Sequence, residues 1–359
     1  MISLVIPAKA EGDKRFVTRL NDEYPATPVA HDSHLISKGD KCQVYSGQYG
    51  IIELLITDEA TFDQDVVAID PLRGTAERLI RANSSHNTFL VTERCDQLCV
   101  MCSQPPKKTH VDRFSEFAAA ALLAPYGETI GISGGEPTLY KEDLLTLIEK
   151  VSGERPDVSF HVLTNGQHFE ASDIKRLQTP AFNNVTWGIP LYSHDANTHD
   201  DIVVKQGAFE RLMESFVHLL KAGAQIELRT VILKNNVKHL PDLARYVATH
   251  LGFIVQWSLM QLENIGFAKA RFNDLYVDHS NAFDPFAEAL DCAELFGVKV
   301  ALFNFTRCSI PKAYQRYAIA SISDWKRKYP SPCNLCAEQS RCCGFFDWHP
   351  DAHMKVYPL

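Results

Sequence analysis

TERCDQLCVMCSQPP, residues 92–106, carries the cysteines Cys95, Cys99 and Cys102 with the spacing Cys-x3-Cys-x2-Cys. The run directly follows a short β-favouring segment, residues 87–91. Three thiolates on one tight loop can bind three irons of a [4Fe–4S] cube, whose irons normally have four cysteine ligands. The remaining iron then needs a ligand from elsewhere. The spacing therefore predicts an iron–sulfur site with one open coordination position.

A second run, TIGISGGEPTLY at residues 129–140, supports this prediction. Paired glycines, Gly134 and Gly135, let a backbone approach a ligand closely, and the Glu136 carboxylate can accept a hydrogen bond from an ammonium group. Alone, the run is typical of a strand-ending turn, and the three cysteines alone could be half of a zinc site or buried apolar thiols. The two runs, about thirty residues apart, together favour a cofactor site.

The two runs resemble the radical S-adenosylmethionine (SAM) superfamily, whose pattern is Cys-x3-Cys-x-hydrophobe-Cys, with Met101 in the hydrophobic position. The resemblance implies that SAM chelates the open iron of the cluster and that the Gly-Gly-Glu run binds the SAM amino group. It also implies cleavage of SAM to a 5′-deoxyadenosyl radical. That chemistry belongs to the cofactors, which the protein positions and shields.

The composition is that of an ordinary globular protein, with 359 residues of which 45% are hydrophobic and 22% charged. Ten cysteines without a signal-like N-terminal segment favour metal ligation in a reducing compartment over disulfides. No apolar run reaches the roughly 18 residues of a membrane span. A net charge of −8 without a long basic block disfavours nucleic acid as a partner. We therefore expect a cytoplasmic protein that does not enter the membrane.

Strand and helix patterns divide the chain into three parts. Residues 1–84 contain short β-favouring runs at 2–6, 43–46, 50–56 and 66–69, and a helical stretch at 74–82. After residue 87, strand-like runs at 88–91, 129–133, 158–163, 185–190, 225–233, 254–259 and 298–303 alternate with helical periodicity at 143–151, 209–222, 240–251 and 283–296. Such alternation implies parallel strands with crossover helices. We predict an α/β chain with a small N-terminal β-rich domain (1–84), a partial (β/α)6 barrel (85–304) and a C-terminal cysteine-rich auxiliary-cluster region (305–359).

Strand ends supply the remaining site candidates, because active-site residues of α/β barrels gather at the C-terminal ends of strands. The resemblance implies SAM contacts for Thr164 and Asn165, for which a simple Asn-Gly turn is the alternative. Arg229 lies in an apolar strand, where an unpaired arginine would be costly, so it faces the SAM carboxylate or forms a structural ion pair. The expected cofactor-binding residues are Met101, Ser133, Gly134, Gly135, Glu136, Thr164, Asn165, Ser193 and Arg229. No catalytic side chain is assigned, although Tyr192, His194 and Asp195 could move hydrogen atoms or protons, or lie in a solvated loop.

The C-terminal region brings a second set of thiols: Cys308, Cys333, Cys336 and Cys342. These four could complete an auxiliary [4Fe–4S] cluster. The alternative is a zinc site, which commonly uses two Cys-x2-Cys pairs, whereas this set has one. The adjacent Cys343 is left as an alternate ligand, a redox partner or a packed thiol.

Residues 85–346 resemble one branch of the superfamily, the His-Xaa-Ser-system radical SAM maturases. The resemblance rests on SHNTFLVTERCDQLCVMCSQPPK, GISGGEPTL, HVLTNG, IPLYS, GFAKA, SISDWK and CNLCAEQSRCCGFF. That family's last block generally ends Cys-Gly-Gly-Phe-Phe, and Cys343 here replaces the first of those glycines. The resemblance implies oxidative crosslinking or other C–H functionalisation of a ribosomally made precursor peptide. The implied partners are that peptide, a flavodoxin- or ferredoxin-type electron donor, and in some systems a second maturase. The alternatives are a small metabolite or RNA base as substrate, or a non-enzymatic electron carrier or zinc-stabilised binding module.

Overall fold

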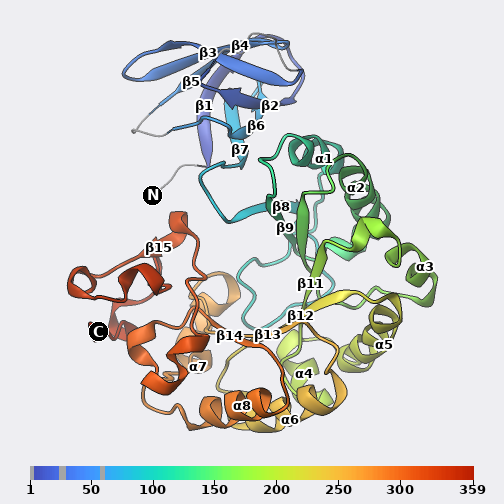
Figure 1. Cartoon of the computed structure of the whole chain (residues 1–359), viewed down its shortest axis with the longest axis vertical. Coiled ribbons are helices and arrows are strands. Elements are labelled where there is room, and N and C mark those ends of the chain that lie inside the picture. Colours follow the sequence, from blue (N-terminus) through green and yellow to red (C-terminus); the bar gives the residue numbers. More distant parts are fainter. Residues whose placement is uncertain (1–3, 24–29, 57–60) are drawn as a thin grey trace. The chain divides into compact units, whose positions relative to one another are not determined.

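The structure, a computed structural model, describes residues 4–23, 30–56 and 61–359 (Figure 1). The chain forms two compact units that are interleaved along the sequence. The first contains residues up to 91 together with 111–133 and 140–161, and the second contains 92–110, 134–139 and 162–359. The chain therefore passes between the units at five points, and each unit is described separately.

Among the described residues of the first unit, seven strands close into a barrel in the order β1-β5-β4-β3-β2-β6-β7. They are β1 (Val5–Ala10), β2 (Phe16–Asn21), β3 (Asp32–Lys38), β4 (Cys42–Gly47), β5 (Gly50–Leu55), β6 (Val66–Asp70) and β7 (Thr75–Ile80). Neighbouring strands are antiparallel, except that β2 and β3 are parallel. Leu20, Tyr45, Ile52 and Ile69 fill its core. The barrel strands all lie within the segment that was expected to be rich in β-structure.

The helix predicted at residues 74–82 is wrong, because this segment is strand β7. A turn with Gly74 at φ +66° brings Thr75 opposite Asp70, so β7 pairs with β6 along its length. Pairing with two neighbours then outweighs the weak helical preference of the TAERLI segment. Strands β2 and β3 were not predicted, and residues 2 and 3 of the run predicted at 2–6 lie outside the described residues.

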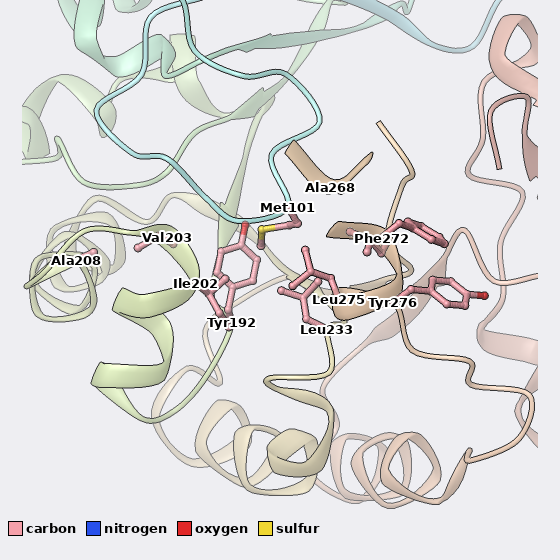
Figure 2. Close-up of a cluster of buried hydrophobic side chains, with 11 residues drawn as sticks. Met101, Tyr192, Ile202, Val203, Ala208, Leu233, Ala268, Phe272, Leu275 and Tyr276 are labelled. Carbon is pink, nitrogen blue, oxygen red and sulfur yellow. The ribbon is translucent and has the colours of Figure 1, made fainter. Parts of the chain in front are cut away.

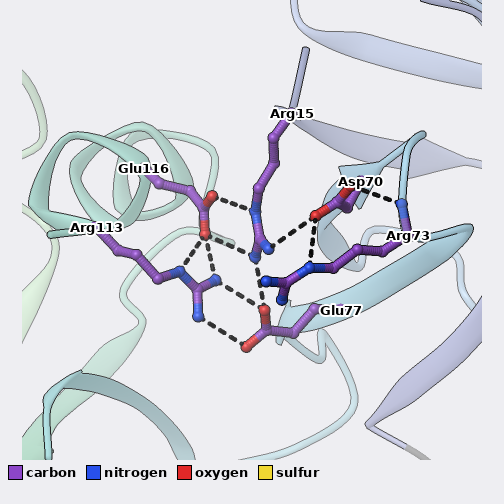
Figure 3. Close-up of polar contacts among 6 residues, drawn as sticks. All are labelled: Arg15, Asp70, Arg73, Glu77, Arg113 and Glu116. Carbon is purple, nitrogen blue, oxygen red and sulfur yellow. Dashed lines mark hydrogen bonds and ion pairs between the residues drawn. The ribbon is translucent and has the colours of Figure 1, made fainter. Parts of the chain in front are cut away.

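A charged network joins this barrel to α1 (Phe114–Leu122) within the first unit (Figure 3). Arg113 donates to the two Glu77 carboxylate oxygens at 2.8 and 3.2 Å. Arg15 donates to Glu77 at 2.7 Å and, through Nε, to Glu116 of α1 at 2.5 Å. Phe89 also stacks on Phe117, with ring centroids 4.8 Å apart. The barrel and α1 are therefore connected by ionic contacts, and α1 also packs on the strand that contains Phe89.

The other large sheet has seven strands within the described residues, in the order β14-β13-β12-β11-β10-β9-β8. They are β8 (Asn87–Thr92), β9 (Thr129–Gly134), β10 (Ser159–Leu163), β11 (Val185–Pro190), β12 (Gln225–Val231), β13 (Gln256–Met260) and β14 (Val300–Phe303). The pairs β11–β12, β12–β13 and β13–β14 are parallel. The main helices are α2 (Lys141–Glu154), α4 (Ala196–Val203), α5 (Ala208–Ala222), α6 (Leu240–His250) and α8 (Asp284–Leu295). Alternating strands and helices confirm the α/β partial-barrel prediction.

Opposite faces of this sheet differ in character, as alternating side chains in strands require. Along β12, Ile226 and Leu228 are fully buried on one face. Glu227 and Arg229 lie on the other face, and the parallel register places Arg229 beside Ser258 of β13. The sheet therefore carries a polar face made by β12 and β13.

The C-terminal region after β14 consists mainly of short 3-10 turns, with one small sheet of β15 (Arg327–Lys328) and β16 (Phe345–Phe346). Such irregular backbone can direct several cysteines toward one point. The domain boundaries at 84/85 and 304/305 stay predictions. Within the described ranges, no helix combines the length and apolar character needed to cross a bilayer.

Candidate active site

The cysteine loop follows β8 and keeps its three thiols half-buried. A tight turn, in which the Cys102 N–H donates to the Cys99 carbonyl at 3.0 Å, sets their spacing. Burial raises the pKa of Cys95 to about 12 and also raises the pKa values of Cys99 and Cys102, and neighbouring thiols add to the effect for Cys95 and Cys99. These groups are therefore neutral thiols near pH 7, unless a metal takes the place of the proton.

Gly135 lets the Gly-Gly-Glu run lie directly against this loop. Its N–H donates to the Thr92 carbonyl at 2.9 Å, and the Glu136 N–H donates to the Arg94 carbonyl at 2.7 Å. A Cβ at Gly135 would lie 2.1 Å from the Arg94 oxygen. We predicted these glycines from the close approach of a ligand, and the structure shows the close approach of the cysteine loop itself.

Gly266 makes a similar approach at the other end of the loop. Its φ is +60°, and a Cβ there would lie 2.3 Å from the Cys102 carbonyl oxygen. The next residue, Phe267, donates its N–H to the same oxygen at 2.8 Å. The sequence analysis assigned Gly266 no role, because its partner lies more than 160 residues earlier in the chain.

Glu136 is fully buried and collects donors from two strand ends. Oε1 accepts from the Thr138 N–H at 2.8 Å and from the Thr164 hydroxyl at 2.6 Å, and Oε2 accepts from the Asn165 N–H at 2.5 Å. Burial raises the pKa of this carboxyl, while the hydrogen bonds oppose the change. Because a carboxylate has about four acceptor positions, Oε2 retains capacity for one more donor. The structure therefore brings Glu136, Thr164 and Asn165 together, as predicted for a common site.

Asp96 directly follows Cys95, and three side chains hold its carboxylate. Two of them, Lys205 and His168, were not predicted as site residues. Its carboxylate accepts from Asn165 Nδ2 at 2.8 Å and from Lys205 Nζ at 2.5 Å, and His168 Nε2 lies 3.3 Å away. Burial alone would raise the pKa of Asp96, but His168 and Lys205 hold it well below its usual range. Asp96 is therefore a charged anchor on the cysteine loop.

Met101 anchors the loop on its apolar side (Figure 2). Its side chain is buried in a cluster with Tyr192, Ile202 and Leu233, and Cys99 packs against the same cluster. Burial, together with the nearby Cys99 and Cys102 thiols, raises the pKa of the Tyr192 hydroxyl well above its usual value. The hydrophobic position of the motif therefore fixes the loop to the core, and a Met101 contact with SAM stays a prediction.

Three further candidates lie at other strand ends. Ser133 is half-buried beside Gly134, and Ser193 is buried and accepts from the Asp195 N–H at 3.1 Å. Arg229 donates to Glu227 Oε2 at 2.9 Å, so the ion pair considered as the alternative for this arginine is present. Their SAM contacts remain predictions.

The C-terminal cysteines predicted to act together line one cavity. Cys308, Cys333, Cys336 and Cys342 lie around a space of about 360 Å³, part of which is open to solvent. Backbone N–H groups reach two of the sulfurs, from Arg307 to Cys342 Sγ and from Leu359 to Cys336 Sγ, each at 3.5 Å. As the chain stands, no three His, Cys, Asp or Glu side chains in the described ranges are grouped so as to hold a single metal ion.

Cys343 does not line this cavity, although its chain neighbours Cys342 and Gly344 do. It is fully buried, packs with Ile322 and Phe346, and donates its thiol to the Gly344 carbonyl at 3.2 Å. A hydrogen bond between the Cys342 and Cys343 thiols lowers the pKa of Cys342 to about 6 and, with burial, raises the pKa of Cys343 well above its usual value. Cys343 is therefore a packed thiol in contact with one predicted ligand, and its roles as alternate ligand or redox partner stay predictions.

One family model matches this chain, and several known proteins are similar to it. Residues 89–247 match the family model described as the radical SAM superfamily. The chain is similar to a GTP 3′,8-cyclase of Campylobacter curvus, with 24% identity over 266 residues, covering 68% of this chain and 74% of that protein. It is also similar to a GTP 3′,8-cyclase of Rhizobium etli, with 29% identity, covering 49% of this chain and 53% of that protein. A solved structure of Streptococcus suis SuiB bound to S-adenosylmethionine aligns with 60% of this chain and 49% of that one, at 15% identity and a TM-score of 0.49.

The matched segment contains the cysteine loop, the Gly-Gly-Glu run and the strand ends of β10 to β12. Radical SAM superfamily membership is thus supported by motif, fold and family model together. These findings support a radical SAM enzyme, and enzymes of that class use a [4Fe–4S] cluster and SAM.

Proposed function

We propose that this enzyme modifies a ribosomally synthesised precursor peptide by oxidative C–H chemistry. In this proposal Cys95, Cys99 and Cys102 hold a [4Fe–4S] cluster, whose open iron binds SAM. When bound, these cofactors supply a 5′-deoxyadenosyl radical that takes a hydrogen atom from the substrate and leaves as 5′-deoxyadenosine. The observation that carries the proposal is the cavity lined by the four C-terminal cysteines.

The protein's own contribution at the first cluster is to bind and orient. Glu136 Oε2, which has a remaining acceptor position, would accept a hydrogen bond from the SAM ammonium group. Arg229 would donate to the SAM carboxylate while Glu227 holds its guanidinium in place. Met101 and the apolar cluster around it would keep water away from the loop.

Cys308, Cys333, Cys336 and Cys342 would hold an auxiliary [4Fe–4S] cluster. Four thiolates satisfy all four irons, so such a cluster has no free position for a substrate and suits electron transfer. Two N–H···S contacts would tune its reduction potential. A reaction that removes two hydrogens from a peptide needs a second electron acceptor, and this cluster fits that need.

A second candidate substrate is a nucleotide or another small metabolite. It is favoured by the two similar proteins named above, which are GTP 3′,8-cyclases. Identity of 24–29% leaves the substrate of this chain open. A cluster with four cysteine ligands would leave such a nucleotide without an iron to bind, so we place the peptide first.

The test uses anaerobically reconstituted protein with SAM and dithionite, which replaces a flavodoxin- or ferredoxin-type donor. One arm contains a precursor peptide with His-x-Ser repeats and the other contains GTP, and both follow 5′-deoxyadenosine and substrate mass. Loss of two hydrogens from the peptide with one 5′-deoxyadenosine per event is the expected result. Conversion of GTP with an unchanged peptide would contradict the proposal and support the second candidate. Cys95→Ala should abolish the reaction, whereas Cys292→Ala on α8, away from both cysteine sets, should not.

A further inference from the structure

We infer that Lys205 is a positioning residue for SAM cleavage, because through Asp96 it clamps the loop that carries the three cysteines. This inference rests on the proposed cluster at that loop. Lys205 donates to the Asp96 carboxylate, so its effect on the cluster would pass through Asp96.

Asp96 lies between Cys95 and Cys99 in the sequence. A contact that fixes the Asp96 side chain therefore also restrains the loop that carries these cysteines. Its two oxygens are held from two different segments: Asn165 at the end of β10, and Lys205 just after α4. The side chains of Asp96 and Lys205 are only 24% and 29% exposed. Their attraction is therefore less screened by water than that of an ordinary surface ion pair.

The backbone of the loop makes a second attachment to the same end of α4. The Leu98 N–H donates to the Val203 carbonyl at 3.2 Å, and the Val100 N–H donates to the Ile202 carbonyl at 2.9 Å. Carbonyls in the last turn of a helix have no partner within the helix. The loop thus completes the C-terminus of α4, while Lys205, two residues beyond that end, holds the loop's carboxylate.

Several backbone contacts fix the connection between α4 and α5, which carries Lys205. Val204 has φ +55°, a conformation that costs free energy for a β-branched residue and persists where its surroundings enforce it. The Lys205 N–H donates to the Asp200 carbonyl at 3.1 Å. The buried Asp200 carboxylate also accepts from the N–H groups of Gly207 at 2.6 Å and Phe209 at 2.8 Å. These contacts fix the backbone on both sides of Lys205.

The positive charge of Lys205 should also affect the reduction potential of the cluster. A cluster with three thiolates makes the surroundings of Asp96 negative, and Lys205 offsets the carboxylate at 2.5 Å. Without the lysine, the carboxylate would keep only Asn165 and His168 as partners, and its less compensated negative charge would lower the reduction potential of the cluster. The clamp is therefore measurable in two ways, as retention of iron and as the cluster potential.

The experiment compares the reconstituted holoenzyme with Lys205→Met, Asp96→Asn and the double variant. It measures the rate of iron loss to a chelator and the midpoint potential of the SAM-binding cluster. We expect each single variant to lose iron on the order of tenfold faster, and the double variant to be no worse than the poorer single one, because both changes break the same contact. Lys205→Met should shift the potential to a more negative value, Asp96→Asn to a more positive one, and the double variant should return toward wild type.

Lys205→Arg should restore most of the retention, and Lys221→Met, at an exposed position on α5, should match wild type. Unchanged iron loss in Lys205→Met would overturn the inference, as would a double variant whose rate multiplies the two single effects. Unmoved potentials would also overturn it, since a purely structural lysine would leave the potential of the surviving cluster unchanged. None of these measurements uses a peptide, so failure of the proposed peptide substrate would be seen separately.

Discussion

Replacing Gly135 by alanine should force the cysteine loop away from the Gly-Gly-Glu run. The new Cβ would lie 2.1 Å from the Arg94 carbonyl oxygen, whereas ordinary contact begins at 3.4 Å, so the two segments must separate by about 1.3 Å. The obstacle is backbone, which has no rotamer with which to escape. Separation would break the hydrogen bonds from Gly135 to Thr92 and from Glu136 to Arg94. Overpacking at about 1–3 kcal/mol and two hydrogen bonds at about 1 kcal/mol each give an expected loss of about 3–5 kcal/mol from the free energy of unfolding.

The assay measures three quantities: chemical denaturation, iron content after reconstitution, and SAM-dependent release of 5′-deoxyadenosine without any other substrate. Because Cys95 follows Arg94, we expect the alanine variant to bind less iron at the cysteine loop and to release little 5′-deoxyadenosine. Gly153→Ala in α2 is the matched control, since no atom lies within 4 Å of its Cβ position. Alanine is favoured over glycine in a helix, so this control should be unchanged or slightly more stable. A Gly135→Ala protein with wild-type iron content and wild-type 5′-deoxyadenosine release would refute the steric argument.

Three other outcomes follow from the structure. Arg113→Met should lower the free energy of unfolding by about 1 kcal/mol, because it removes partly exposed ion pairs to Glu77 of the barrel and Glu116 of α1. The loss should be smaller at high salt, and denaturation at two salt concentrations measures this. Burial lowers the pKa of His199 and of His349 to about 4, so the folded state stays unprotonated where the unfolded chain, with pKa about 6.5, takes up protons. Stability should therefore fall as pH drops from 6.5 toward 4, by about 2 kcal/mol per histidine at pH 5, and His199→Gln should flatten the profile; rising stability in acid would contradict this. Cys343→Ser should keep the full iron content, whereas Cys342→Ser should lose iron from the C-terminal site; equal losses would show that Cys343 is also a ligand.

The alternating part of the fold was predictable because its strands and helices have strong local periodicity. Each predicted strand from β8 to β14 is present, with ends displaced by at most two residues. The N-terminal barrel was less accessible, since β2 and β3 are defined by partners far along the chain. Segment 75–80 shows the limit most clearly, because TAERLI favours a helix locally and becomes β7 only when β1 and β6 lie beside it.

Some residues of the candidate site could likewise be predicted from the sequence, and others could not. Spacing alone indicated the cysteine loop, and the structure brings Glu136, Thr164 and Asn165 together beside it. Lys205 and Gly266 had no comparable signal, because a lysine after a helix and a glycine in a loop are common. Their importance comes from contacts more than 100 residues apart, which no local pattern records.

The docking of the cysteine loop has a consequence for biosynthesis. Residues 92–110 leave the ribosome long before Lys205 and Gly266 are made, so the nascent loop lacks the contacts that fix it. Its thiols stay open to oxidants and to stray metal ions until translation has passed residue 267. A stall before that point would leave three unprotected cysteines on an unfinished polypeptide.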